Sequence, residues 1–168
     1  MNDLSRSGVP EHRNLFRAIL SAGLLAGTLD ITAAIIHYVI KTGKNPVTIL
    51  NYIASGVFGK AAFGNNNWMP VIGLIFHYCI ATIFTAFFFL IYPKFKLLSW
   101  NIVLSGLFYG IFVWVVMNLI VVPLSAISRF PSSVLQSVIS CLILMFAIGL
   151  PAAIMAYRYY FSESTNKE

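Results

Sequence analysis

Four long apolar runs divide the chain, and each is long enough to cross a lipid bilayer as a helix. A hydrocarbon core of about 30 Å requires about 20 helical residues. The four predicted spans cover residues 18–40, 71–92, 102–122 and 134–157. Aromatic residues such as Trp68 and Trp100 lie near the span ends, as is typical of membrane interfaces. The pattern predicts an all-α membrane protein with four transmembrane helices in a single domain, residues 18–157.

A shorter helix is predicted between the first and second spans. Asn45-Pro46 is typical of a helix start, because proline is favoured in the first helical turn. Apolar residues then recur at helical spacing as far as Phe58. A helix over 46–58 is too short to cross the bilayer. We therefore expect an additional outer interfacial or re-entrant helix, and its spacing does not decide between lying flat and dipping inward.

The composition supports a membrane protein and argues against a nucleic-acid-binding one. The chain has 168 residues, of which 59% are hydrophobic and only 10% are charged, whereas about 25% are charged in a typical soluble domain. The formal charge of +6 comes from basic residues at the ends of apolar runs. No basic stripe with interleaved aromatic residues is present, so we expect the lipid bilayer, and not nucleic acid, as the partner.

The distribution of Lys and Arg predicts the orientation. With the N-terminus inside, seven basic residues lie on the inner side and four on the outer side. The positive-inside rule then places both termini in the cytoplasm. Residues 1–17 would form a cytoplasmic N-terminal segment and residues 158–168 a cytoplasmic C-terminal tail.

Asp30 is the most informative residue of the first span, because a carboxylate in the hydrocarbon core is energetically costly. A rise of about 1.5 Å per residue places it about 15 Å below the outer boundary, close to the midplane. It shares one helix face with Gly23 and Gly27, and small residues allow close helix approach, so we expect Asp30 to point at other helices. It is either a hydrogen-bonded structural carboxyl group or a proton carrier.

Three further polar residues are expected in the middle and outer half of the bundle, namely His37, His77 and Asn118. Their estimated depths place them with Asp30 around a polar pocket that opens outward, as a polar core or a proton path. The alternative for each histidine is a hydrogen-bonded core residue, and Asn118 is expected to bond between helices.

Small residues also predict the contacts between helices, because glycine lets two backbones approach closely. The glycines expected at these contacts are Gly23, Gly27, Gly73, Gly106, Gly110 and Gly149. Pro151 is expected to bend the fourth span.

The chain has no common catalytic or phosphate-binding motif, so we do not expect an enzyme. Cys79 and Cys141 lie inside apolar runs and form no metal motif, so no metal or other cofactor is expected. Two histidines in the membrane leave a b-type haem electron carrier as an alternative, since His37 and His77 are estimated to differ by only about 4 Å in depth.

Short motifs in all four spans resemble the YagU-like family of bacterial inner-membrane proteins. They are Gly23–Asp30, Gly73 with His77, Met117-Asn118 with Pro123-Leu124-Ser125, and Gly149-Leu150-Pro151. The resemblance covers most of the chain from about Ser21 to Ala156. It implies a compact four-helix unit in a bacterial cytoplasmic membrane, and it supplies no assigned activity.

Two main functional hypotheses remain. The first is a structural or accessory membrane module whose polar core around Asp30 fixes helix packing, within a homo-oligomer or a larger membrane complex. The second is a proton- or cation-linked transporter or channel subunit that uses Asp30 and His77.

Overall fold

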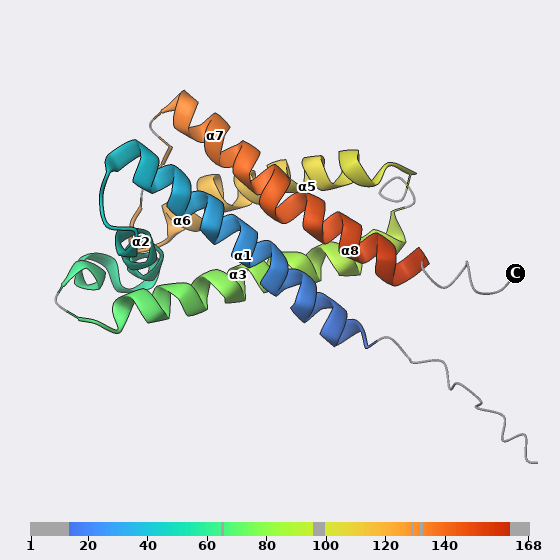
Figure 1. The fold of residues 1–168 in the computed structure, drawn as a ribbon, viewed down its shortest axis with the longest axis horizontal. Coiled ribbons are helices and arrows are strands. Elements are labelled where there is room, and N and C mark those ends of the chain that lie inside the picture. The colour runs from blue at the N-terminus through green and yellow to red at the C-terminus, as the bar shows by residue number, and fades with distance from the viewer. Residues whose placement is uncertain (1–13, 65, 96–99, 129, 132, 162–168) are drawn as a thin grey trace, which may run out of the picture.

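The computed structural model describes residues 14–64, 66–95, 100–128, 130–131 and 133–161, and this part of the chain contains helices and no strand. Four helices are long and apolar enough to cross a membrane (Figure 1). They cover Leu15–Thr42, Met69–Lys94, Ile102–Leu124 and Val134–Phe161. The predicted fold class, an all-α membrane protein with four transmembrane helices, is confirmed. Most of the two predicted cytoplasmic end segments, residues 1–13 and 162–168, lies outside the described residues.

The first two spans are regular α-helices. Helix α1 runs over Leu15–Thr42 and helix α3 over Met69–Ile91, continued by a 3₁₀ turn at Tyr92–Lys94. Asn14 begins α1 by accepting a hydrogen bond from the backbone N–H of Phe16, at 3.0 Å. Gly43 ends α1 in the left-handed region, with φ of 63°, which glycine adopts without steric cost.

Each of the last two spans is interrupted by a π-helical turn. The third span comprises α5 (Ile102–Val116), the π turn Met117–Val121 and α6 (Val122–Leu124). The fourth comprises α7 (Val134–Leu144), the π turn Met145–Gly149 and α8 (Leu150–Phe161).

A proline follows each π turn after one intervening residue, as Pro123 in the third span and Pro151 in the fourth. Proline lacks a backbone N–H and its ring crowds the carbonyl four residues earlier, so a regular α-helix is disturbed at that point. The wider turn just before each proline absorbs the misfit. At Pro151, where the sequence predicts a bend, the structure therefore has a π turn.

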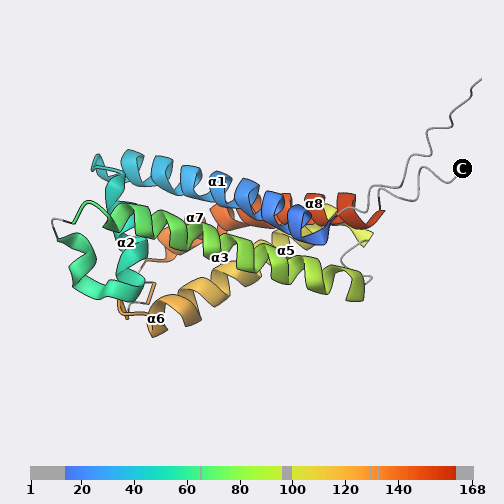
Figure 2. The ribbon, with the colours of Figure 1, turned by 90° about the horizontal axis from the view of Figure 1, so that it is seen from below.

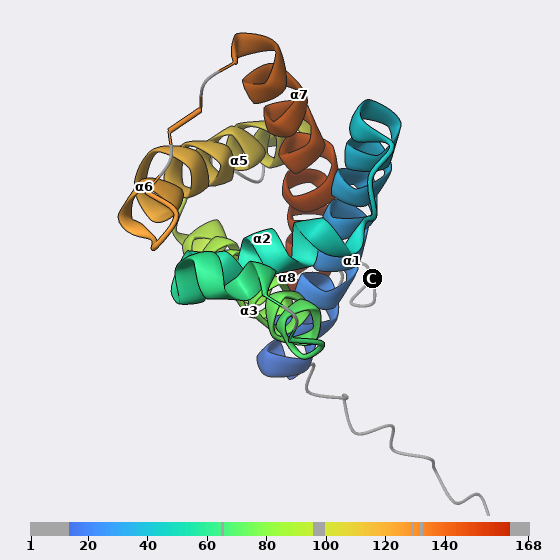
Figure 3. The same cartoon turned by 90° about the vertical axis from the view of Figure 1, so that its left-hand side faces the viewer.

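The predicted extra helix is present as α2 (Val47–Phe58), followed by a 3₁₀ turn at Gly59–Phe63. It lies across one end of the bundle formed by the four spans (Figures 1, 2 and 3). The loop after the third span is tied to it, because the backbone N–H of Ala126 donates to the carbonyl of Gly56 at 2.9 Å. This placement agrees with a helix lying flat across the bundle end.

The six glycines predicted at helix contacts all lie at close approaches. A Cβ atom on Gly106 would lie 2.9 Å from the carbonyl oxygen of Gly149, and one on Gly149 would lie 2.9 Å from the backbone N of Gly110. Comparable approaches surround the other members of the set, Gly23, Gly27 and Gly73. The contacts fix α1 against α3, α3 against α2, and α5 against the π turn of the fourth span.

The half of the bundle away from α2 is filled by aromatic side chains. Phe88 and Tyr109 lie with ring centroids 4.5 Å apart, and both are buried. The Tyr109 hydroxyl donates to the Phe84 carbonyl at 2.5 Å, and the Tyr160 hydroxyl donates to the Phe89 carbonyl at 2.9 Å. We call this set the aromatic plug; it comprises Phe88, Phe89, Tyr92, Tyr109 and Tyr160.

Candidate functional site: a polar cavity beneath helix α2

A cavity of about 630 Å³ lies between α2 and the aromatic plug. Its walls come from α1, α2, α3, the third span and the first half of the fourth. The four residues that the sequence predicts for a polar core or proton path, Asp30, His37, His77 and Asn118, all line it. The structure therefore brings together side chains that lie up to 88 positions apart in the sequence.

Asp30 faces this cavity from the middle of α1 and is half-buried. Its carboxylate has no hydrogen-bond or ion-pair partner within the described part of the chain. His77 is close enough to interact with it electrostatically. Asp30 is also the only acidic residue between positions 12 and 162 of the sequence, so the whole transmembrane domain contains a single carboxylate side chain.

His77 is tied to α1 through its ring. Its Nε2 lies 2.8 Å from the carbonyl oxygen of Gly27. A carbonyl oxygen can only accept, so Nε2 must carry the proton and donate it. The carbonyl that accepts this bond lies three residues before Asp30 on α1, and Nδ1, the second ring nitrogen, has a lone pair when the ring is neutral.

Asn118 bonds within its own helix, which corrects the expectation of an interhelical bond. Its Nδ2 donates to the carbonyl oxygen of Trp114 at 3.0 Å. The residue lies in the π turn Met117–Val121, where the regular backbone pattern is interrupted and a side-chain amide can supply a donor. This bond uses one of the two amide hydrogens, so the side chain keeps a second N–H donor and Oδ1 as an acceptor.

The cavity mouth contains a connected group that the sequence reasoning missed. Lys41 donates through Nζ to Oε1 of Gln136, and Nε2 of Gln136 lies 2.6 Å from Nε2 of His37. The lysine ammonium can only donate, so the carboxamide nitrogen of Gln136 must donate to a lone pair on His37. These contacts join the end of α1 to the start of α7. The sequence feature that could have indicated these contacts is Gln136, a polar residue in the first turn of an apolar span.

The cavity ends at apolar side chains on the side away from α2. Phe84, Val113 and Ile148 line that end, and the aromatic plug lies beyond them. Ser140 is part of the wall, where its hydroxyl accepts from Trp114 Nε1 at 2.8 Å and donates to the Ser137 carbonyl at 3.0 Å. In this conformation the polar groups are accessible from the α2 end and are separated from the opposite end of the bundle.

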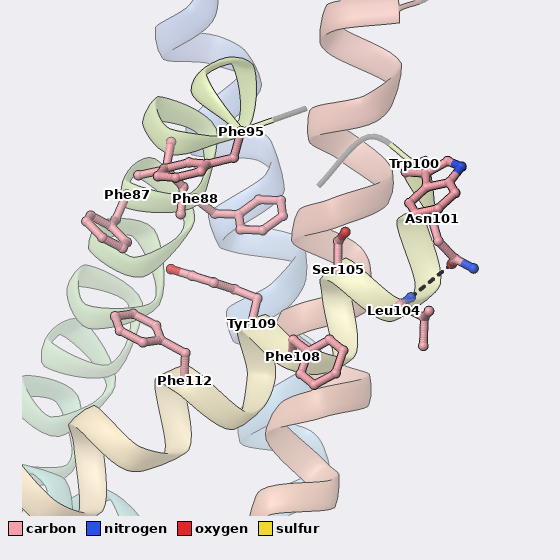
Figure 4. A pocket seen from close by; sticks show the side chains of 11 residues that line it. Phe87, Phe88, Phe95, Trp100, Asn101, Leu104, Ser105, Phe108, Tyr109 and Phe112 are labelled. Atoms are coloured by element: carbon pink, nitrogen blue, oxygen red, sulfur yellow. Dashed lines mark hydrogen bonds between the residues drawn. The ribbon is translucent and has the colours of Figure 1, made fainter. Parts of the chain in front are cut away.

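A second hollow of about 660 Å³ lies between α3 and α5 beside the aromatic plug. Figure 4 shows Phe87, Phe112 and Phe108 around it, with Trp100 and Asn101 at one end. Its lining contains no acidic or basic side chain. Helices α3 and α5 meet here through aromatic side chains such as Phe87 and Phe112, whose ring centroids lie 5.7 Å apart. This hollow is apolar, and its lining offers no charged group for proton or ion chemistry.

The described residues contain no cluster of three or more His, Cys, Asp or Glu side chains suited to a metal ion. The two histidines proposed above for haem ligation both have Nε2 engaged, His77 with Gly27 and His37 with Gln136. A bis-histidine site through these atoms would require both contacts to break.

No protein-family model, curated protein or solved structure matches the chain. The resemblance to the YagU-like family therefore stays a prediction, and the site has to be interpreted from its own geometry.

Proposed function

We propose that this multi-pass membrane protein is a subunit of a proton- or cation-linked transporter, in which Asp30 takes up and releases the ion. The observation that carries the proposal is the placement of Asp30. It lines a cavity beside His77 and has no hydrogen-bond or ion-pair partner within the described residues. A charged residue at the centre of a membrane helix costs roughly 3 kcal/mol on insertion scales.

The contacts that hold the bundle together do not involve Asp30. Helices α1 and α3 are joined by the His77–Gly27 bond and by a hydrogen bond between the hydroxyls of Thr28 and Tyr78 at 2.9 Å. The third and fourth spans are joined by Trp114 and Ser140. An interhelical hydrogen bond in a membrane is worth only about 0.6 kcal/mol on average. Even one such bond to Asp30 would therefore offset only a small part of the free-energy cost of placing its carboxylate in the membrane. A proton- or cation-binding role gives the carboxylate a function that an apolar side chain lacks.

His77 is suited to assist this exchange. With Nε2–H donating to the carbonyl of Gly27, Nδ1 is the ring nitrogen available to accept a proton. The aromatic plug prevents passage to the opposite end of the bundle in this conformation. Transport would therefore require the helices to rearrange, and the seam between α3 and α5, where aromatic contacts border a hollow of about 660 Å³, is a suitable place for that movement.

The second candidate is the structural or accessory membrane module. It is favoured by the aromatic plug, which closes the cavity, and by the dense glycine contacts between the spans. In that case Asp30 would be a solvated polar residue whose replacement by asparagine changes little.

Proton flux into proteoliposomes separates the two candidates. Protein is reconstituted with a pH-sensitive dye inside, and a pH gradient is imposed. On the transport proposal, wild-type protein accelerates pH equilibration, Asp30→Asn abolishes the acceleration, and His77→Gln reduces it. Asp3→Asn is the matched control, because it makes the same chemical change in the N-terminal segment. Equal rates for Asp30→Asn and wild type would support the accessory role.

We further propose that the protein resides in a bacterial cytoplasmic membrane with both termini in the cytoplasm. Lys94 and Arg158, like Arg17, belong to the basic majority on the terminal side, whereas the α2 side has fewer basic residues. The cavity would then open toward the outer face of the membrane.

A further inference from the structure

Asp30, His77 and Asn118 each bring a hydrogen-bond acceptor to the cavity lining. His77 Nε2–H donates to the carbonyl of Gly27 and one of the two Asn118 Nδ2 hydrogens donates to the carbonyl of Trp114, while His77 Nδ1 and Asn118 Oδ1 can accept. The Asp30 carboxylate accepts only, when ionised. Three helices therefore present acceptor atoms to one cavity, and one of these groups carries a negative charge.

The charges that face the cavity are unevenly placed. Asp30 is the only acid, and α2 and the third span contribute no charged side chain to the lining. Lys41 and His37 lie toward the mouth, two to three turns of α1 from Asp30, and both contact Gln136. Lys41 is exposed, so water screens its charge at the mouth. The interior around Asp30 consequently favours a cation.

The remaining wall is apolar and aromatic. Ile31, Ile53 and Ile80 line the cavity, as do Tyr52 and Phe84. Its volume of about 630 Å³ is within the range of pockets for small organic ligands. Aromatic side chains also attract cations through their ring faces. A ligand that fits this surface has a cationic, donor-rich head and an apolar body.

We propose that the cavity binds an apolar primary amine, with its ammonium group on Asp30 and its hydrocarbon body against the isoleucine and aromatic wall. An ammonium donates N–H bonds to the Asp30 carboxylate, and His77, which interacts electrostatically with Asp30, lies beside that site. A metal cation fits less well, because the described residues hold no cluster of metal-ligating side chains. The inference rests on the proposed function in one respect: the amine and the proton compete for the same carboxylate.

Binding of 4-phenylbutylamine to the full chain in lipid nanodiscs tests the proposal. Equilibrium dialysis against labelled amine, corrected with empty nanodiscs, gives the affinity. We expect the neutral analogue 4-phenylbutanol and the anionic 4-phenylbutyrate to bind wild-type protein about tenfold more weakly or not at all. Asp30→Asn should lose about tenfold or more in amine affinity, as expected when one member of a buried charge pair is removed. Asp3→Asn should retain wild-type affinity.

The pH dependence of the wild-type protein provides a readout that needs no variant. Acidification should weaken amine binding, because a proton on Asp30 displaces the ammonium. At a pH at which Asp30 is protonated in the empty site, each ammonium bound should release one proton, and at a pH at which Asp30 is ionised it should release none. Asp30→Glu, which keeps the charge, should retain measurable binding if Asp30→Asn fails to fold. Equal binding of the amine and the alcohol, or full amine affinity in a folded Asp30→Asn variant, would overturn the proposal.

This test and the proton-flux test can fail separately. Asp30-dependent proton flux without amine binding would leave the transport proposal standing and would refute the amine ligand. Asp30-dependent amine binding without any effect on proton flux would establish the binding site and refute proton-linked transport.

Discussion

At the scale of single residues, the glycines at the helix contacts and Asp30 contribute to different properties of the protein. The six glycines act through contact: each lacks a Cβ that would crowd a neighbouring helix, at its backbone or, for Gly27, at the side chains of Tyr78 and Ala81. Asp30 makes no such contribution, because its carboxylate faces a cavity and has no hydrogen-bond partner within the described residues. The fold thus depends on the small residues, and the chemistry depends on the single acid among them.

Gly73 is the glycine at which this dependence is simplest to measure. A Cβ on Gly73 would lie 2.8 Å from the carbonyl carbon of Leu50, a backbone atom that cannot rotate away. We expect Gly73→Ala to destabilise the protein by about 1–3 kcal/mol, as overpacking does, and to loosen α2 from α3. Thermal unfolding in detergent measures the effect.

The matched control is Gly56→Ala in α2, where the nearest atom, the Cβ of Ser125, would lie at an ordinary 3.8 Å. This change should be neutral or stabilising by up to about 1 kcal/mol, because alanine is the better helix former. Equal destabilisation by both substitutions would contradict a specific close approach at Gly73.

At the scale of secondary-structure elements, two π turns shape the walls of the cavity. Met117 and Asn118 belong to one of these turns and Ile148 to the other, and all three line the cavity. Both turns precede a proline, which gives them a common physical cause. A hydropathy pattern contains no signal for a π turn, although the two prolines marked where the helices would be disturbed.

Replacing Pro151 by alanine restores a backbone N–H and should let the π turn relax toward a regular α-helix. A π turn accommodates one more residue than a regular α-helical turn, so its loss should rotate α7 by about 100° relative to α8. A short thiol cross-linker between His37→Cys and Gln136→Cys, with Cys79 and Cys141 removed, should then react several-fold more slowly. Pro93→Ala, in the 3₁₀ turn at the opposite end of the bundle, should leave cross-linking unchanged. Unchanged cross-linking in Pro151→Ala would contradict this account of the turn.

Helix α2 should show the accessibility of a helix lying flat across the bundle end. Spin labels placed along Thr48 to Phe58 should show collision rates with oxygen and with a water-soluble relaxant that oscillate with a period of about 3.6 residues. Val57 is exposed, whereas Ala54 and Ser55 are buried, so labels at these sites define the two extremes. Uniform aqueous exposure along the segment would indicate an ordinary loop.

At the scale of the whole molecule, the sequence predicted the four spans closely and the site only in outline. The helices extend up to four residues beyond the predicted boundaries, because helix ends continue into the polar interface, where hydropathy falls before the helix stops. Spacing on α1 and estimated depth were sufficient to group Asp30 with His77. The partner of Asn118 and the Lys41–Gln136–His37 contacts depend on the rotation of α5 and α7, which periodicity leaves undetermined.

The orientation of the molecule is open to direct labelling. On a background without Cys79 and Cys141, cysteines at Asn66 and Ser128 should react with an impermeant thiol reagent in intact cells. Cysteines at Ser5 and Ser164 should react only after the membrane is permeabilised. The reverse pattern would refute the proposed orientation, and labelling of one terminus alone would refute an even number of spans.

The central claim is that Asp30 is a water-accessible carboxylate that binds and releases a proton. Infrared difference spectroscopy of the protein in lipid, recorded as the pH is varied, observes this event directly. Subtracting the Asp30→Asn spectra removes the contribution of the acids in the terminal segments. We expect one carboxylic-acid band that grows on acidification, shifts promptly in D₂O and is absent from Asp30→Asn. A spectrum in which wild type and Asp30→Asn titrate identically would contradict the account.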